Sequence, residues 1–142
     1  MEFHRTPGNR CVAPRKHVLV CEDTLCYQAQ LGALLAAEFN SYGSGAEGYV
    51  QVTFVTGAIA AVAILEKLPV DLIVLDHDMP DGNGTDLLLY LKGAGLNVPV
   101  LTASGVESNN DAMMQCGATY KGNKGLVLTP GGAKYIRSLI GL

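Results

Sequence analysis

Acidic side chains come directly after two apolar segments of this chain, and a hydroxyl and an amine follow two others. Glu22 and Asp23 end the first apolar segment, and Asp76 ends the segment that begins at residue 70. Ser104 ends a later apolar segment, and Lys124 closes a weaker one. If these segments are parallel strands of one sheet, their carboxyl ends meet at one edge, where such sheets bind ligands. We therefore expect the five side chains to lie together.

Three carboxylates in one place repel one another, so they raise a pKa or require a cation. An all-oxygen donor set favours a hard ion that keeps some of its waters, which points to Mg²⁺ held by Glu22, Asp23 and Asp76. Such a metal would attract a phosphate group, and one carboxylate could then attack phosphorus as a nucleophile. Lys124 would neutralise oxygens of the transferring group, and the Ser104 hydroxyl would donate a hydrogen bond to it.

Each of these features also has an ordinary structural explanation. An acid at the end of a strand often occurs by chance, a lysine near a strand end is usually solvated, and Ser104 could simply cap the following helix. The placement of all of them at successive strand ends is harder to explain in that way. The joint pattern therefore favours a functional site.

The elements that must position these residues alternate regularly along the chain. Apolar and β-branched runs predict strands, and apolar residues at helical spacing predict helices. Thr129 followed by Pro130 is typical of an N-cap and a first helical position. The predicted strands are 17–23, 50–56, 70–76, 98–104 and 118–124, and the predicted helices are 24–40, 57–68, 83–95, 107–117 and 130–140.

Strands without alternation of apolar and polar residues, separated by helices, indicate a parallel sheet covered on both faces. We expect an α/β fold with a doubly wound five-stranded parallel sheet in the flavodoxin-like order 2-1-3-4-5 and helices on both faces. Residues 1–16 are expected to form a flexible tail and residues 17–142 one domain. The Gly-rich segment 43–48 is expected to be a loop at the edge of the sheet opposite the site.

Composition limits the kinds of function that fit. Hydrophobic residues make up 49% of the chain and the net charge is −3, so a compact soluble fold is favoured and direct nucleic-acid binding is not expected. No apolar run is long enough for a membrane span, and the polar N-terminus lacks a signal peptide, so a cytoplasmic location is expected. The four cysteines match no zinc pattern and are interpreted as small buried or half-buried thiols (Cys11, Cys21, Cys26 and Cys116).

The stretch DLIVLDHDMPDGNGTDLL at 71–88 resembles the response-regulator receiver domain, the phosphorylated switch of two-component signalling. It is similar to that family's apolar strand, phosphoacceptor Asp, Met-Pro pair and Gly-containing turn. VPVLTASG at 98–105 and CGATYKGNK at 116–124 resemble two further family segments, and the likeness extends over residues 17–141.

The resemblance implies that Asp76 accepts a phosphoryl group from the phospho-His of a histidine kinase or a phosphotransfer protein. It implies Mg²⁺ held by Asp23, Asp76 and the main-chain carbonyl of Asp78, with Glu22 acting through water. It also implies that Ser104 moves inward on phosphorylation, and that Lys124 is the site lysine. The chain would then catalyse only its own phosphorylation and dephosphorylation. A homodimer formed through the fourth and fifth strand–helix units is left as an open alternative. The sequence names neither the kinase nor the target.

Some positions depart from the family pattern. Gly125 replaces the expected Pro, and Tyr120 lies one place earlier than the family's strand-five aromatic when the count is anchored on Lys124. Lys121 is therefore an alternative site lysine. Thr102 is a weaker alternative to Ser104, because it would lie inside the strand.

Three other interpretations compete. A receiver-like fold could have lost phosphorylation and act only as a binding module. Asp76-His77-Asp78 also fits the Asp-x-Asp core of a haloacid-dehalogenase-type phosphatase, although Met79 and Pro80 then follow in place of the expected residues. An EF-hand calcium loop is rejected, because it needs a ligand where Pro80 stands. His77 itself is expected to point away from the site.

Overall fold

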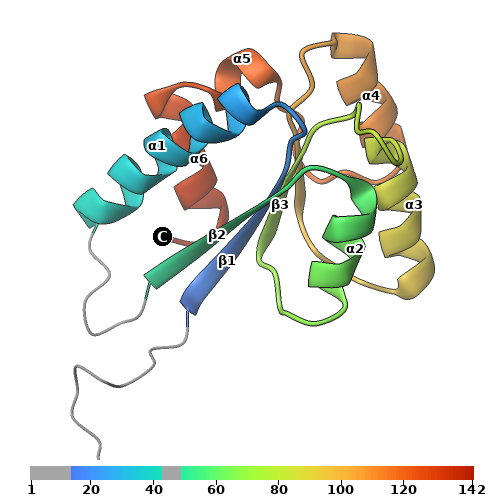
Figure 1. The fold of residues 1–142 in the computed structure, drawn as a ribbon, viewed down its shortest axis with the longest axis horizontal. Helices are drawn as coiled ribbons and strands as arrows, with labels where there is room; N and C mark the ends of the chain where they lie inside the picture. The colour runs from blue at the N-terminus through green and yellow to red at the C-terminus, as the bar shows by residue number, and fades with distance from the viewer. Residues whose placement is uncertain (1–13, 43–48) are drawn as a thin grey trace, which may run out of the picture.

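The computed structural model describes residues 14–42 and 49–142 of the chain, shown in Figure 1. Its strands are β1 (Pro14–Cys21), β2 (Tyr49–Val55), β3 (Leu72–Leu75) and β4 (Val100–Thr102). Its helices are α1 (Leu25–Tyr42), α2 (Ala58–Leu65), α3 (Gly84–Ala94), α4 (Glu107–Gln115), α5 (Lys124–Val127) and α6 (Pro130–Leu139).

The four strands form one parallel sheet in the order β2-β1-β3-β4. The chain runs from β1 outward to β2 and then returns to the other side of β1 with β3, so the strand order reverses between β1 and β3. Helices α1, α5 and α6 cover one face of the sheet, and α2, α3 and α4 cover the other (Figure 1). The predicted α/β architecture with helices on both faces is therefore confirmed.

The prediction of a fifth strand was wrong for the described residues. Only one bridge, between Leu101 and Tyr120, joins residues 118–124 to the sheet. This segment has one glycine, one asparagine and two lysines among seven residues, a poor composition for a strand. In its place the chain makes a turn and then the short helix α5, which the sequence analysis did not predict. Asn123 caps this helix, since its side chain accepts a hydrogen bond from the amide of Leu126 at 2.8 Å.

Two hydrophobic cores form because the buried strands send alternate side chains to opposite faces. Ile73 and Leu75 of β3 pack in one core beneath α2, α3 and α4, while Leu72 and Val74 pack in the other with α1 and α6. All four side chains are at most 1% exposed. This confirms the prediction that β3 is buried on both faces. Such burial fixes the position of Asp76, the residue that follows the strand, at the edge of the sheet.

Several boundaries differ from the prediction. β1 begins at Pro14, inside the segment assigned to the tail, while residues 1–13, Cys11 and the loop 43–48 lie outside the described residues. Thr129 is the N-cap of α6, with Pro130 in its first turn as predicted. Of the other cysteines, Cys21 is buried and Cys116 is half-buried as expected, but Cys26 on α1 is exposed.

Candidate functional site

The structure brings together the three carboxylates that follow β1 and β3. Glu22, Asp23 and Asp76 each offer an oxygen atom, and these atoms all lie within 4.8 Å of one another. Glu22 and Asp76 are buried, whereas Asp23 is exposed. The cluster lies where the strand order reverses, the position at which parallel sheets of this kind bind ligands.

The backbone holds the acids in place because the sheet hydrogen bonds continue one residue past the strands. The amide of Glu22 donates to the carbonyl of Val55, and the amide of Asp76 donates to that of Cys21, both at 3.0 Å. The Oδ1 atom of Asp76 also accepts a hydrogen bond from the amide of His77 at 2.8 Å. Its other oxygen is left to face the cluster.

Lys124 brings a positive charge into this cluster. Its Nζ atom lies 3.0 Å from Oε1 of Glu22 and 3.2 Å from Oδ2 of Asp76. The same ammonium group lies 4.5 Å from the centre of the Tyr27 ring, a cation–π arrangement. Its backbone amide donates to the carbonyl of Ser104 at 3.1 Å, which ties the start of α5 to the end of β4.

The other candidate lysine lies elsewhere. The amine of Lys121 pairs with the carboxylates of Glu107 and Asp111 on α4, the second at 2.7 Å. These partners raise the pKa of Lys121, through their hydrogen bonds above all. Of the two lysines that the sequence left open, the structure places only Lys124 among the acids.

Burial and charge change the acidity of the clustered groups. Burial raises the pKa of Asp76, and the negative charge of Glu22 acts in the same direction, while the Lys124 ammonium partly offsets both. Burial alone would lower the pKa of Lys124, but its two carboxylate partners outweigh this effect and raise it. Cys21, buried one residue before the cluster, has its pKa raised to about 12 by burial and by the charge of Asp76. Its thiol is therefore inert at neutral pH.

The Ser104 hydroxyl is buried at the end of the segment that contains β4. Its Oγ atom accepts a hydrogen bond from the amide of Val106 at 3.0 Å. The side chain of Asn110, which is fully buried on α4, accepts from the amide of Ser104 at 2.9 Å and donates to its carbonyl at 3.0 Å. Ser104 is thus fixed by α4 at the carboxyl edge of the sheet.

Thr102, the alternative hydroxyl, lies within β4, as the sequence analysis foresaw. Its Oγ1 atom donates to the carbonyl of Gly122 at 3.2 Å and accepts from the amide of Gly122 at 2.9 Å. Both hydrogen-bonding roles of this hydroxyl are therefore used to hold the segment that replaces the fifth strand.

Asp78 does not belong to the carboxylate cluster. Its side chain is 75% exposed, and its Oδ1 atom lies 2.8 Å from Nδ1 of His77. The imidazole of His77 is directed to this acid, and its side chain is only 14% exposed. A contribution of Asp78 to metal binding would come from its main-chain carbonyl, as the resemblance implied.

Sequence reasoning missed two side chains that shape the site. Tyr27 lies on the first turn of α1, four residues after Asp23, and that spacing was its only signal. Asn110 gave no signal, because only the folded structure shows that α4 turns it toward Ser104. Both residues act on groups that the sequence did identify.

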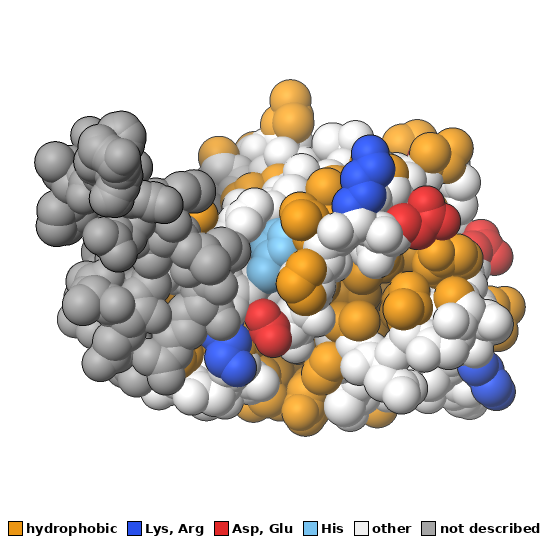
Figure 2. Space-filling model, turned by 90° about the horizontal axis from the view of Figure 1, so that it is seen from below, with side chains coloured by type: hydrophobic (Ala, Val, Ile, Leu, Met, Phe, Trp, Pro, Cys, Tyr) orange, Lys and Arg blue, Asp and Glu red, His pale blue; other side chains and the backbone are white. Residues whose placement is uncertain are grey.

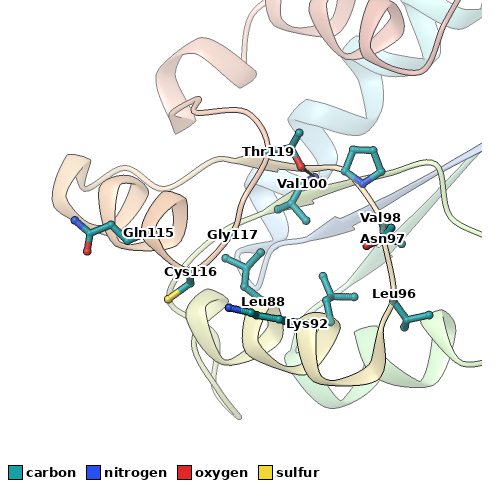
Figure 3. Close-up of a pocket in the computed structure, with 12 residues that line it drawn as sticks. Leu88, Lys92, Leu96, Asn97, Val98, Val100, Gln115, Cys116, Gly117 and Thr119 are labelled. Carbon is teal, nitrogen blue, oxygen red and sulfur yellow. Dashed lines mark hydrogen bonds between the residues drawn. The ribbon is translucent and has the colours of Figure 1, made fainter.

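A cavity of about 430 Å³ lies at the opposite edge of the sheet, between the ends of α3 and α4 (Figure 3). Leu88 and Lys92 of α3 and Cys116 after α4 line it, and none of the clustered acids does. Figure 2 shows the molecule from this end, where hydrophobic side chains gather on the right with few charges among them. The acid cluster and this cavity are therefore separate features.

Comparison with known proteins defines the class of this domain. The family model for the response regulator receiver domain matches residues 18–124. The chain therefore belongs to the response regulator receiver domain family. A comparison with curated protein sequences found no match. Across residues 14–42 and 49–142, no helix has the length and apolar character that a membrane crossing requires.

Solved structures agree with this assignment. The signal receiver domain of a histidine kinase from Syntrophus aciditrophicus is 26% identical with a TM-score of 0.67, over 88% of this chain and 89% of that one. The receiver domain of Francisella response regulator 1452 is 20% identical with a TM-score of 0.68, over 88% and 96%. A CheY-like receiver protein from Methanospirillum hungatei is 21% identical with a TM-score of 0.68, over 87% and 93%.

Proposed function

We propose that this domain accepts a phosphoryl group on Asp76 in a Mg²⁺-dependent reaction, and that the phosphorylated form changes a protein-interaction surface. The donor is the phospho-His of a histidine kinase or of a histidine phosphotransfer protein. The observation that carries the proposal is the Lys124 ammonium, 3.2 Å from Asp76 and 3.0 Å from Glu22, beside three converging carboxylates.

The chain's own residues support each part of the transfer. An oxygen of the Asp76 carboxylate attacks phosphorus, an O–P bond forms, and the N–P bond to the donor histidine breaks, so the donor imidazole leaves with the electron pair. Lys124 neutralises charge that develops on the phosphoryl oxygens. The Ser104 hydroxyl, released from the amide of Val106, donates a hydrogen bond to one of them. The domain acts only on its own Asp76.

The donor set fits Mg²⁺ because it consists of carboxylate oxygens, with one exposed acid to admit a hydrated ion. We assign Asp23, Asp76 and the main-chain carbonyl of Asp78 as ligands, with Glu22 acting through water. When bound, Mg²⁺ supplies positive charge that offsets the charge of the incoming phosphoryl group. Burial is the main cause of the raised pKa of Asp76, and a divalent cation beside the buried carboxylate would offset this cost.

Treatment with acetyl phosphate tests the proposal directly. We expect one phosphoryl group per chain in the presence of Mg²⁺, detected as a mass increase, and none after chelation. Asp76→Asn should abolish the modification. Asp78→Asn is the matched control, since it neutralises a neighbouring exposed acid but keeps the main-chain carbonyl, and it should still be modified.

Phosphorylation that survives in Asp76→Asn would contradict the assignment. An unmodified wild-type chain that also fails to bind the phosphate mimic beryllium fluoride would favour a domain that serves only to bind a partner. Continuous turnover of a phosphate ester would instead favour a phosphatase of the haloacid-dehalogenase type.

A further inference from the structure

An open apolar groove lies between α2 and α3, away from the Asp76 carboxylate. It encloses about 420 Å³, within the range of about 300–1,000 Å³ typical of binding clefts. Ile59 and Val62 of α2 line one wall, and Leu87 and Tyr90 of α3 line the other. Each helix therefore contributes two large side chains three residues apart, which lie about one helical turn apart on the same face.

The groove leaves hydrophobic surface exposed to solvent, and this exposure does not stabilise the isolated domain. Ile59 is 71% exposed although it stands on the first turn of a helix that packs on the sheet. Leu87 beneath it is only 1% exposed, so the floor of the groove is continuous with the hydrophobic core. A partner that covers Ile59 would bury this surface together with the ring of Tyr90.

The charged side chains that line the groove are both acidic. Asp81 and Asp86 line it, and the Oε2 atom of Glu66 accepts a hydrogen bond from the Tyr90 hydroxyl at 3.3 Å. No lysine or arginine is among the residues that line it. An occupant with positive charges beside an apolar stripe would match both the apolar walls and the acidic side chains of the groove. An acidic or purely apolar occupant would match only the apolar walls.

The walls of the groove are well fixed. Asp81 accepts hydrogen bonds from the amides of Ala58 at 2.6 Å and Ile59 at 3.1 Å, so it caps α2 and ties the loop after β3 to it. These bonds lower the pKa of Asp81, which keeps it charged at neutral pH. Asp86 accepts from the amide of Asn83 at 2.8 Å, which fixes the start of α3. The groove is therefore preformed, and binding need not first order its walls.

We propose that the α2–α3 groove docks a basic amphipathic helix of a partner protein. The apolar stripe of that helix, at i, i+3/i+4 and i+7 spacing, lies between Ile59 and Tyr90, and its Lys or Arg side chains face Asp86 and Glu66. This surface goes beyond the phosphoryl acceptor role, and its occupancy does not require modification of Asp76. The unphosphorylated chain is therefore the species to test.

The test uses a helix-stabilised peptide of about 14 residues, with leucines at this spacing and lysines beside them. A second peptide is identical except that glutamates replace the lysines. We expect the basic peptide to shift the amide NMR signals of residues 58–62 and 86–90, and we expect no binding of the acidic peptide. Signals that move instead on α4 or α6, or equal binding of both peptides, would overturn the proposal.

Variants of the chain locate the contacts. Ile59→Ser should weaken peptide binding about tenfold, because it removes a central apolar contact. Leu89→Ser is the matched control, since Leu89 is 56% exposed on α3 but does not line the groove, and its affinity should equal that of the wild type. Both positions are exposed, so neither change should unfold the chain. Equal affinity of Ile59→Ser and the wild type would overturn the proposal.

A charge variant tests the acidic rim. Asp86→Asn keeps an oxygen that can accept from the amide of Asn83, so α3 stays capped, and it should weaken binding about threefold with a smaller salt dependence. Glu107→Gln on α4 is the control for the same change in net charge and should have no effect. If sedimentation shows a self-associating chain that Ile59→Ser makes monomeric, the groove belongs to a second copy and the proposal is wrong.

Discussion

Within residues 14–42 and 49–142, the charge balance of the acid cluster depends on Lys124, whose ammonium pairs with both Glu22 and Asp76. Removal of its ammonium leaves the three carboxylates more negative. We expect Lys124→Met to bind Mg²⁺ more tightly, yet to be phosphorylated about 10- to 100-fold more slowly, because charge on the transferring group is then less well neutralised. Calorimetry with Mg²⁺ and the rate of modification by acetyl phosphate measure the two effects.

Lys121→Met is the control, because that lysine pairs with α4 and not with the cluster. It should change neither quantity. Weaker Mg²⁺ binding by Lys124→Met would show that the lysine does not compete with the metal for the carboxylates.

The raised pKa of Asp76 makes stability depend on pH. Between the ordinary Asp value of 3.8 and the raised pKa, the folded chain binds more protons than the unfolded chain. The free energy of unfolding therefore falls as pH rises through this window, and the cost is fully present above the raised pKa. We expect Asp76→Asn to melt at a higher temperature than the wild type at pH 7 without divalent ions, with the difference lost below about pH 3.8.

Thermal unfolding in a chelating buffer at both pH values measures this effect. Asp78→Asn is the comparison, since the Asp78 side chain is 75% exposed and its replacement should change the melting temperature less. A lower melting temperature for Asp76→Asn at pH 7 would mean that the buried carboxylate stabilises the fold instead.

At the residue scale, the sequence predicts the acids well, because the residue that follows a buried parallel strand must lie at the carboxyl edge of the sheet. The choice between Lys121 and Lys124 could not be made in this way. It depends on the turn at Gly122, whose packing against Thr102 is a tertiary contact.

At the scale of elements, the two hydrogen bonds of Asn110 join α4 to the end of β4. Asn110→Ala removes both and leaves the buried amide of Ser104 without this partner, while the carbonyl of Ser104 still accepts from the amide of Lys124. We expect the free energy of unfolding to fall by about 2 kcal/mol, the cost of one unsatisfied buried amide. Urea denaturation measures it, with Asn109→Ala as the control one residue earlier on the same helix. An equal loss in both variants would assign the effect to the helix and not to the contact with Ser104.

Element prediction succeeded for strands rich in branched apolar residues and for helices with clear caps. It failed at residues 118–127, where the strand signal was weak and Asn123 acts as an N-cap within the expected strand. From the sequence alone, Asn123 could be either a helix N-cap or a strand residue. The interaction that decides between them is its hydrogen bond with the amide of Leu126, which exists only after folding.

At the scale of the whole molecule, a metal that binds only the folded chain must stabilise all of it. The acids come from two separate strand ends, so unfolding destroys the cluster. Mg²⁺ at about 100 times its Kd should raise the free energy of unfolding by about 2.7 kcal/mol. Chemical denaturation with and without Mg²⁺ measures this gain, which Asp23→Asn should reduce and Asp78→Asn should leave unchanged. An equal gain in Asp23→Asn would exclude Asp23 as a ligand.

The architecture of the whole domain was largely predictable, because alternating apolar strands and amphipathic helices admit few arrangements besides a doubly wound sheet. The alternation of Leu72 and Val74 against Ile73 and Leu75 between two cores is the physical basis of that prediction. The groove between α2 and α3 was not predictable, since it depends on how far apart two helices sit on one face.

The single bridge at Tyr120 determines where the segment before α5 can change in length. In a continuous strand, one inserted residue would turn every later side chain to the opposite face. Here the chain leaves the sheet after one pairing, but the hydrogen bonds of Gly122 to Thr102 and of Lys124 to Ser104 still fix the residues that follow. A residue inserted after Gly122 would therefore move the lysine away from the acids, and we expect selection to keep the length of this part of the chain constant.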